Sequence, residues 1–99
     1  MPAVLYLPEA SDDLERLREF LVESDVVAAN ETSLLITEAI NVLVNHPMIG
    51  RAGANGFREL VISRGRSGYV ALYKFDEREN RILIAAIRHQ REAGYGPAS

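Results

Sequence analysis

The spacing of apolar residues changes along this chain, and that change restricts the fold more than any other feature. Before residue 45, apolar residues recur at intervals of three and four, the spacing of one face of a helix. After residue 56 they alternate or run continuously, as they do in strands that border a core. Helices and strands separated in this way predict an α+β domain, with the helices packed on one face of a sheet.

Two helices are predicted in the first half of the chain. The first spans roughly 9–23, and its apolar face consists of Ala10, Leu14, Leu17 and Leu21. Ser24 and Asp25 can cap the second helix, because their side-chain oxygens accept hydrogen bonds from first-turn amides. His46 and Pro47 end that helix. The link between the two helices is short, so we expect an antiparallel hairpin.

Four strands are expected, at residues 3–7, 57–63, 69–75 and 81–87. Turn-forming residues fill the two short links between the last three strands. The predicted order is β-α-α-β-β-β, a helical hairpin packed on a small, mostly antiparallel sheet. The glycine-rich segment 46–56 is expected to be a connector. It lacks the Gly-Lys-Ser/Thr ending of a phosphate-binding loop and leads into a strand.

The length of 99 residues fits a single domain, which we place at 1–95, followed by a short C-terminal tail at 96–99. A chain of this size can bury one core, and a deep cofactor cavity beside it is not expected. The chain has no cysteine, which excludes disulfides and thiolate nucleophiles. His46 and His89 have no partner at the spacing of helical metal ligands. We therefore expect no metal and no cofactor.

No targeting or membrane segment is predicted. The N-terminus has a short apolar run but no basic region before it and no small-residue cleavage site after it. The longest apolar stretches fall well below the roughly 18 residues expected of a membrane span. We expect a cytoplasmic protein without a membrane partner.

Charge is distributed unevenly along the chain. The net charge of −3 argues against a general nucleic-acid binder. Residues 1–49 carry nine acids and two bases (−7), whereas residues 50–99 carry five acids and nine bases (+4). Either the helices simply carry the acids and the sheet the arginines, or the second half presents a basic face to an acidic partner.

One cluster of residues has the composition of a recognition surface. Its members follow the last predicted strand: Arg88, His89, Arg91 and Tyr95. Further tyrosines and arginines lie on or beside the two preceding strands: Tyr69, Tyr73, Arg58, Arg64 and Arg66. Such groups can bind the carboxylates of a protein partner, grip phosphates and stack on RNA bases, or line a solvated sheet edge. The residue types alone leave all three open.

Several segments resemble the RelE/ParE toxin family of type II toxin–antitoxin systems. Three come from the second half: 57–62 (Phe-Arg-Glu-Leu-Val-Ile), 68–73 (Gly-Tyr-Val-Ala-Leu-Tyr) and 87–95 (Ile-Arg-His-Gln-Arg-Glu-Ala-Gly-Tyr). Three come from the first: 6–10 (Tyr-Leu-Pro-Glu-Ala), 13–16 (Asp-Leu-Glu-Arg) and 46–51 (His-Pro-Met-Ile-Gly-Arg). The resemblance covers about residues 4 to 95 and implies the same β-α-α-β-β-β fold.

The resemblance also implies one of two activities. RelE-like members cut mRNA on the ribosome with a set of basic residues, and ParE-like members inhibit DNA gyrase. RelE-like toxins carry an arginine after the Ser-Gly-Tyr of the middle strand, where this chain has Val70, and a second arginine where it has His89. Tyr95 matches a tyrosine of the RelE-like enzymes. Valine can neither donate to a phosphate nor neutralise it. We therefore expect a ParE-like gyrase inhibitor without catalytic residues, and the alternative is a RelE-like mRNA endoribonuclease.

The implied partners are DNA gyrase and a cognate ParD-like antitoxin, with DNA contacted only through the antitoxin. We expect the target to bind Arg88, His89, Arg91 and Tyr95. We expect the antitoxin to bind apolar anchors and arginines on the strands: Phe57, Arg58, Leu60, Ile62, Arg64, Arg66, Tyr69 and Tyr73. Ile87 is the last residue with core character, so deletion of residues 88–99 is expected to abolish toxicity and leave the fold largely intact.

Overall fold

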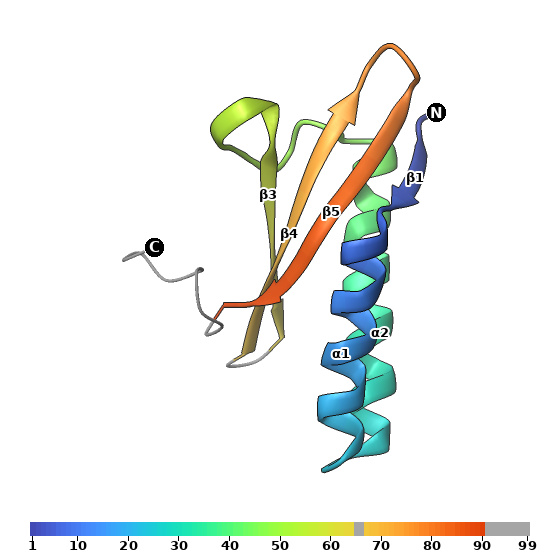
Figure 1. The fold of residues 1–99 in the computed structure, drawn as a ribbon, viewed down its shortest axis with the longest axis vertical. Coiled ribbons are helices and arrows are strands. Elements are labelled where there is room, and N and C mark those ends of the chain that lie inside the picture. The colour runs from blue at the N-terminus through green and yellow to red at the C-terminus, as the bar shows by residue number, and fades with distance from the viewer. Residues whose placement is uncertain (65–66, 91–99) are drawn as a thin grey trace.

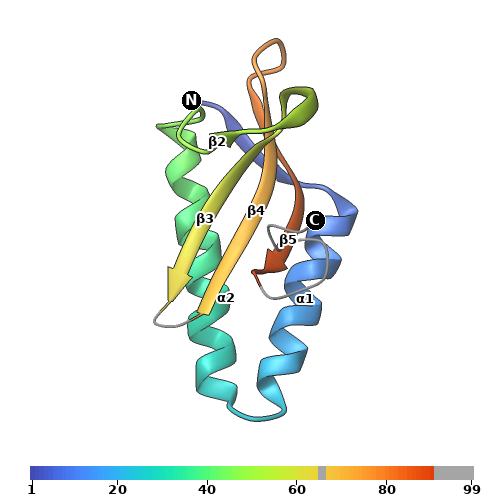
Figure 2. The ribbon, with the colours of Figure 1, turned by 90° about the vertical axis from the view of Figure 1, so that its left-hand side faces the viewer.

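The computed structural model describes residues 1–64 and 67–90, apart from the side chains of residues 64 and 67. The chain folds into two layers, with a pair of antiparallel helices on one face of a sheet (Figures 1 and 2). The elements are β1 (Ala3–Tyr6), α1 (Pro8–Val22), α2 (Val26–Asn41), the 3₁₀ turn η1 (Val42–Val44), β2 (Arg51–Ala52), the 3₁₀ turn η2 (Ala54–Gly56), β3 (Arg58–Arg64), β4 (Ser67–Asp76) and β5 (Arg81–His89). The predicted fold class is confirmed. The predicted boundary between residues 95 and 96 lies outside the described residues.

The sheet has five strands in the order β1-β5-β4-β3-β2. β1 runs parallel to β5 and pairs with it from Ala3 to Tyr6, and every other neighbouring pair is antiparallel. A register shift between Leu72 and Tyr73 bends the long β4–β5 ladder. β2 was not predicted, since its two residues lie inside the segment 46–56 that we expected to be only a connector.

The helical hairpin begins where the sequence indicates, but α2 ends at Asn41, before the predicted stop at His46 and Pro47, and the 3₁₀ turn η1 follows it. Pro8 opens α1, where its fixed φ suits the first turn and its missing N–H is not needed. Asp25 caps α2, and its side chain accepts a hydrogen bond from the Ala28 amide at 3.1 Å. The Ser24 hydroxyl instead donates to the Leu21 carbonyl at the end of α1 (3.2 Å). The tight turn therefore holds both helix ends together.

The core lies between the helices and the sheet. The helices contribute Ala10, Leu17, Ile36, Ile40 and, just beyond α2, Leu43. The sheet contributes Ile62, Tyr69, Ala71, Tyr73, Ile82, Ile84 and Ile87. Each large aliphatic side chain buried in this way stabilises the fold by about 1.5–3 kcal/mol. Alternate residues of β4 face the helices, so Val70 points to the opposite face of the sheet.

The segment Val26–Val44 is long and apolar enough to cross a membrane by length and composition alone, with a mean hydropathy of 1.2. The sequence was expected to hold no apolar stretch of that length. Ile36, Ile40 and Leu43 lie on one side of this segment and are fully buried in the core. That packing is typical of the core helix of a globular domain.

A hydrogen-bonded anchor fixes the segment that leads from α2 to β3. The buried Tyr73 hydroxyl accepts from the Gly50 amide and donates to the Pro47 carbonyl, both at 2.8 Å. A Cβ at Gly50 would lie 2.6 Å from the Tyr73 ring, so only glycine fits there. Arg58 donates to the Met48 and Gly50 carbonyls at 3.1 and 2.7 Å. This segment is therefore tied to the centre of the sheet.

The β4–β5 turn is stabilised by one carboxylate. Asp76 accepts a hydrogen bond from the Glu79 amide at 3.2 Å and forms an ion pair with Arg81 at 3.4 Å. These contacts, the Glu79 amide first, hold the pKa of the Asp76 carboxyl below its usual value. Asn80 completes the turn with a φ of 53°, a conformation that asparagine tolerates.

Candidate functional site

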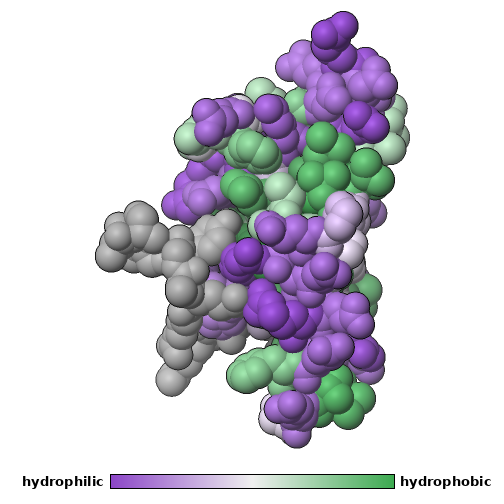
Figure 3. Space-filling model, in the orientation of Figure 1, coloured by the Kyte–Doolittle hydropathy of each residue, from purple (hydrophilic) through white to green (hydrophobic). Residues whose placement is uncertain are grey.

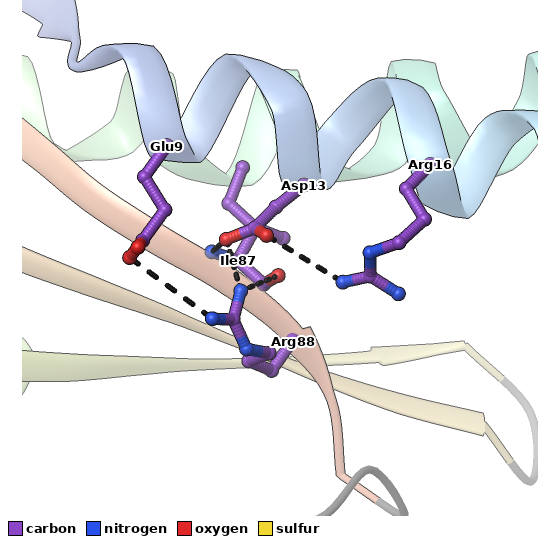
Figure 4. A network of polar contacts seen from close by, with 5 residues as sticks. All are labelled: Glu9, Asp13, Arg16, Ile87 and Arg88. Atoms are coloured by element: carbon purple, nitrogen blue, oxygen red, sulfur yellow. Dashed lines mark hydrogen bonds and ion pairs between the residues drawn. The ribbon is translucent and has the colours of Figure 1, made fainter.

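The end of β5 lies against α1 through a buried carboxylate (Figure 4). Just after β1, the Leu7 amide donates a hydrogen bond to the Ile84 carbonyl of β5 (2.9 Å). β5 continues beyond this point to His89. Beyond β1 the partner of the β5 backbone is Asp13 of α1, whose carboxylate accepts a hydrogen bond from the Ile87 amide at 2.9 Å. A helix side chain thereby satisfies a backbone donor that no strand reaches within the described residues.

Arg88 neutralises the same carboxylate. Its guanidinium forms an ion pair with the Asp13 oxygen that accepts from Ile87, and also lies 4.0 Å from the Glu9 carboxylate. Arg16 approaches the other Asp13 oxygen at 3.5 Å. Asp13 is only 6% exposed, and a buried carboxylate requires both charge compensation and hydrogen bonds. We call Glu9, Asp13, Arg16 and Arg88, with the Ile87 backbone, the Asp13 network.

The last residues of β5 also contact β4. The His89 ring meets the Tyr69 ring edge to face, with centroids 5.2 Å apart. The Gln90 amide donates to the Gly68 carbonyl at 2.9 Å. Val70, which is 2% exposed, lies directly opposite Arg88 in the β4–β5 register. This end of the sheet therefore presents a valine and an arginine whose guanidinium is turned toward α1.

Two of the four residues predicted to bind the target are described, and they are neighbours. Arg88 and His89 are both half-buried at the end of β5. Arg91 and Tyr95 lie outside the described residues. Target binding by this cluster stays a prediction. Against the expectation that the fold needs nothing after Ile87, Arg88 forms an ion pair with the buried Asp13.

Three of the predicted antitoxin anchors are in the wrong place to be surface anchors. Ile62, Tyr69 and Tyr73 are 3%, 3% and 0% exposed and pack under the helices. Their alternation places them on the core face, and sequence alone does not show which face of a strand is covered. The free chain does not offer these side chains to a partner.

The other predicted antitoxin-binding residues are only partly accessible. Phe57 and Leu60 are half-buried, and the Lys74 ammonium lies 5.3 Å from the Phe57 ring centroid. Arg58 is occupied by the carbonyl oxygens of the segment before β2. Arg66 and the Arg64 side chain lie outside the described part of the chain.

Exposed apolar residues were missed, and two groups of them lie at the turn of the helical hairpin and before β2, apart from others such as Leu5 and Leu34. At the turn of the helical hairpin, Phe20, Val26 and Val27 are 72%, 55% and 64% exposed, and Figure 3 shows apolar surface at that end of the molecule. Before β2, Met48 and Ile49 are exposed on the anchored segment. No periodicity distinguishes these residues from the core residues beside them in the sequence.

The basic half of the chain is partly neutralised by its own carboxylates. Arg51 pairs with Glu59 at 3.1 Å, Arg81 with Asp76, and Arg88 with Asp13. Among the described arginines, these three therefore face carboxylates and do not form a continuous basic face. Among residues 1–64 and 67–90, no three histidine, aspartate or glutamate side chains are grouped closely enough to hold a metal ion.

A shallow groove of about 460 Å³ runs between the two helices, away from the Asp13 network. Its lining includes Tyr6, Leu14, Ser33 and Thr37. Burial raises the pKa of the Tyr6 phenol above its usual value of 10.0, so the hydroxyl is neutral at physiological pH. The groove lining also includes one residue of each charge, Glu15 and Arg18.

The fold is that of toxins from bacterial toxin–antitoxin systems. It matches a chain of the chromosomal ParDE system of P. aeruginosa with a TM-score of 0.72, at 22% identity, over 89% of this chain and 95% of the other. It matches a chain of the RelBE2 toxin–antitoxin complex of Mycobacterium tuberculosis with a TM-score of 0.56, at 21% identity, over 90% of this chain and 99% of the other.

Sequence comparison places the chain more narrowly. The profile of the ParE toxin of type II toxin–antitoxin systems matches residues 4–94. Toxin RelE3 of Caulobacter vibrioides is 35% identical over 92 residues, which cover 93% of this chain and 98% of that toxin. The chain belongs to the ParE toxin family of type II toxin–antitoxin systems. The predicted resemblance is confirmed.

Proposed function

We propose that this toxin inhibits DNA gyrase by binding it, in the cytoplasm, and has no catalytic residue of its own. The observation that carries the proposal is Val70. This residue occupies the middle-strand position at which the RelE-like nucleases of the resemblance have an arginine. Because valine offers no charge and no hydrogen bond, it cannot stabilise the phosphate during RNA cleavage.

The surroundings of Val70 support the same conclusion. The cation opposite it, Arg88, is engaged by Asp13 and approached by Glu9. RNA cleavage requires positive charge for the phosphate, and in the Asp13 network the two guanidinium groups face two carboxylates, which leaves no net positive charge there. A protein target has no such requirement, since arginine and aromatic side chains are common anchors in protein interfaces.

The alternative is a ribosome-dependent mRNA endoribonuclease. It is favoured by the name of the 35% identical Caulobacter relative, Toxin RelE3. In this alternative His89 takes the place of the second arginine, and Tyr95 the place of the matching tyrosine.

One pair of assays separates the two activities. We expect the purified toxin to inhibit supercoiling by gyrase and to leave mRNA on programmed ribosomes intact. Adding the cognate antitoxin, encoded by the neighbouring gene, should restore supercoiling. Cleavage of ribosome-bound mRNA with normal supercoiling would refute the gyrase proposal and establish the nuclease.

We propose that the antitoxin adds a strand to the exposed edge of β3. Both structural relatives above come from toxin–antitoxin systems. The Gly53 amide donates to the Phe57 carbonyl at 2.8 Å, so Phe57 directs its backbone groups toward β2. Residues two apart in a strand face the same edge, which applies to Val61 and Ser63. Among the described residues, β2 pairs only with Arg58 and Glu59, so this edge beyond Glu59 is available for strand addition.

Val61 offers a direct test of strand addition. The variant Val61→Pro removes the amide donor at the exposed edge, where proline is tolerated because the β3–β4 ladder does not use that donor. We expect its affinity for the antitoxin to fall about tenfold, the value of one interfacial hydrogen bond. Titration calorimetry measures the change, and Val61→Thr, which keeps the amide and a β-branched side chain, is the matched control. Unchanged affinity of a folded Val61→Pro would exclude this edge.

A further inference from the structure

We propose that Asp13 is a positioning residue for the toxin's target-binding end: it fixes where the chain leaves the sheet after β5. The inference rests on the proposed function in one respect, namely that the target is bound by Arg88 and His89. It assigns a role in that function to a side chain of α1 that cannot itself reach the target, since Asp13 is 6% exposed.

The strand pattern makes the end of β5 dependent on α1. On one side β5 pairs with β4 as far as His89, opposite Tyr69. On the other side β1 stops at Tyr6, opposite Ile84, so within residues 1–64 and 67–90 no strand pairs on that side with the next five residues of β5. Within the described residues, the Asp13 carboxylate provides the hydrogen bond to the backbone of this overhang, at Ile87.

The ion pair adds orientation to this attachment. The same carboxylate oxygen of Asp13 binds both the Ile87 amide and the Arg88 guanidinium. Two consecutive residues of β5 therefore contact one atom of α1. The Arg88 guanidinium also donates to the Ile87 carbonyl at 3.3 Å. Separating the partners of a buried ion pair leaves a buried charge without compensation, so the pair favours the arrangement in which Asp13 and Arg88 meet. The chain reaches Gln90 from a fixed strand end and not from a frayed one.

Asp13→Asn tests the proposal with little change in shape. The amide oxygen of asparagine can still accept from Ile87, but the charge that holds Arg88 is gone. The matched control is Asp12→Asn, which removes the same charge from the preceding residue of α1, where the side chain is exposed. Four measurements are made on each protein: circular dichroism with thermal unfolding, antitoxin affinity, amide hydrogen exchange at residues 85–90, and the amount of toxin needed to arrest growth.

We expect Asp13→Asn to remain folded and to bind the antitoxin within about threefold of the wild type. Its amides at residues 87–89 should exchange faster, and growth arrest should need about tenfold more toxin, the scale of a lost interface anchor. Asp12→Asn should match the wild type in all four measurements.

Other outcomes overturn the proposal. If Asp13→Asn unfolds, or loses antitoxin binding and toxicity in equal proportion, Asp13 only stabilises the fold. If it arrests growth as well as the wild type, the end of β5 needs no positioning. Growth arrest does not depend on which target is hit, so a wild type that stops growth without inhibiting gyrase refutes the proposed function alone. A wild type that does not arrest growth refutes both.

Discussion

Replacement of Tyr73 by alanine is expected to leave the toxin largely unfolded at 37 °C. Tyr73 is fully buried at the centre of the sheet, and removing a buried aromatic ring costs about 3–5 kcal/mol. Its hydroxyl also bonds the Gly50 amide and the Pro47 carbonyl, which contributes about 1 kcal/mol for each bond. The sum approaches the roughly 5–15 kcal/mol that stabilises an ordinary domain.

Tyr73→Phe separates the two contributions. It keeps the ring and leaves the Gly50 amide without its acceptor, at a cost of about 1–3 kcal/mol. Urea unfolding followed by circular dichroism should therefore rank the proteins as wild type, Tyr73→Phe and Tyr73→Ala. If Tyr73→Ala is as stable as the wild type, the buried ring and its two hydrogen bonds do not hold the fold together, and this account of the core is wrong.

The fold could be predicted because its main determinants are local. The apolar spacing from Ala10 to Leu21 is visible only as a helix face, and Pro8 and Asp25 mark helix starts with groups that belong to the first turn. In the strands that flank the short turns, apolar residues alternate in the sequence as core-facing residues do in the structure. What could not be predicted is β2, because a two-residue strand has no period and forms only where β3 already provides a partner.

The candidate site was harder to predict because its contacts are distant in the sequence. Asp13 and Ile87 are 74 residues apart, and an aspartate on an amphipathic helix has no feature that distinguishes it from Asp12. The need for an acceptor at the Ile87 amide becomes visible only in the structure, where β1 ends at Tyr6, opposite Ile84. Ile62, Tyr69 and Tyr73 were misplaced for a related reason: tyrosine is common both in cores and in interfaces, and alternation fixes two faces without saying which is covered.

Two truncations should separate the support of the fold from recognition of the target. Deletion of residues 91–99 leaves the Asp13 network complete. We therefore expect the free energy of unfolding to stay within about 1 kcal/mol of the wild-type value. The deleted segment carries Arg91 and Tyr95, and loss of such anchors costs about 2–4 kcal/mol of binding. This shorter toxin should therefore be folded, bind the antitoxin and fail to arrest growth. Growth arrest at the wild-type level would remove residues 91–99 from the target interface.

Deletion of residues 88–99 should have a much larger effect on stability, contrary to the expectation from the sequence. It removes one of the two guanidinium groups at the buried Asp13 and leaves Arg16 at 3.5 Å, and removing one partner of a buried ion pair costs up to about 3–5 kcal/mol. The new terminal carboxylate on Ile87 would add a second negative charge beside Asp13. Combining the deletion with Asp13→Asn removes the buried charge, so part of the lost stability should return. If both truncations unfold at the same urea concentration, Arg88 does not support the core, and the sequence-based expectation is right.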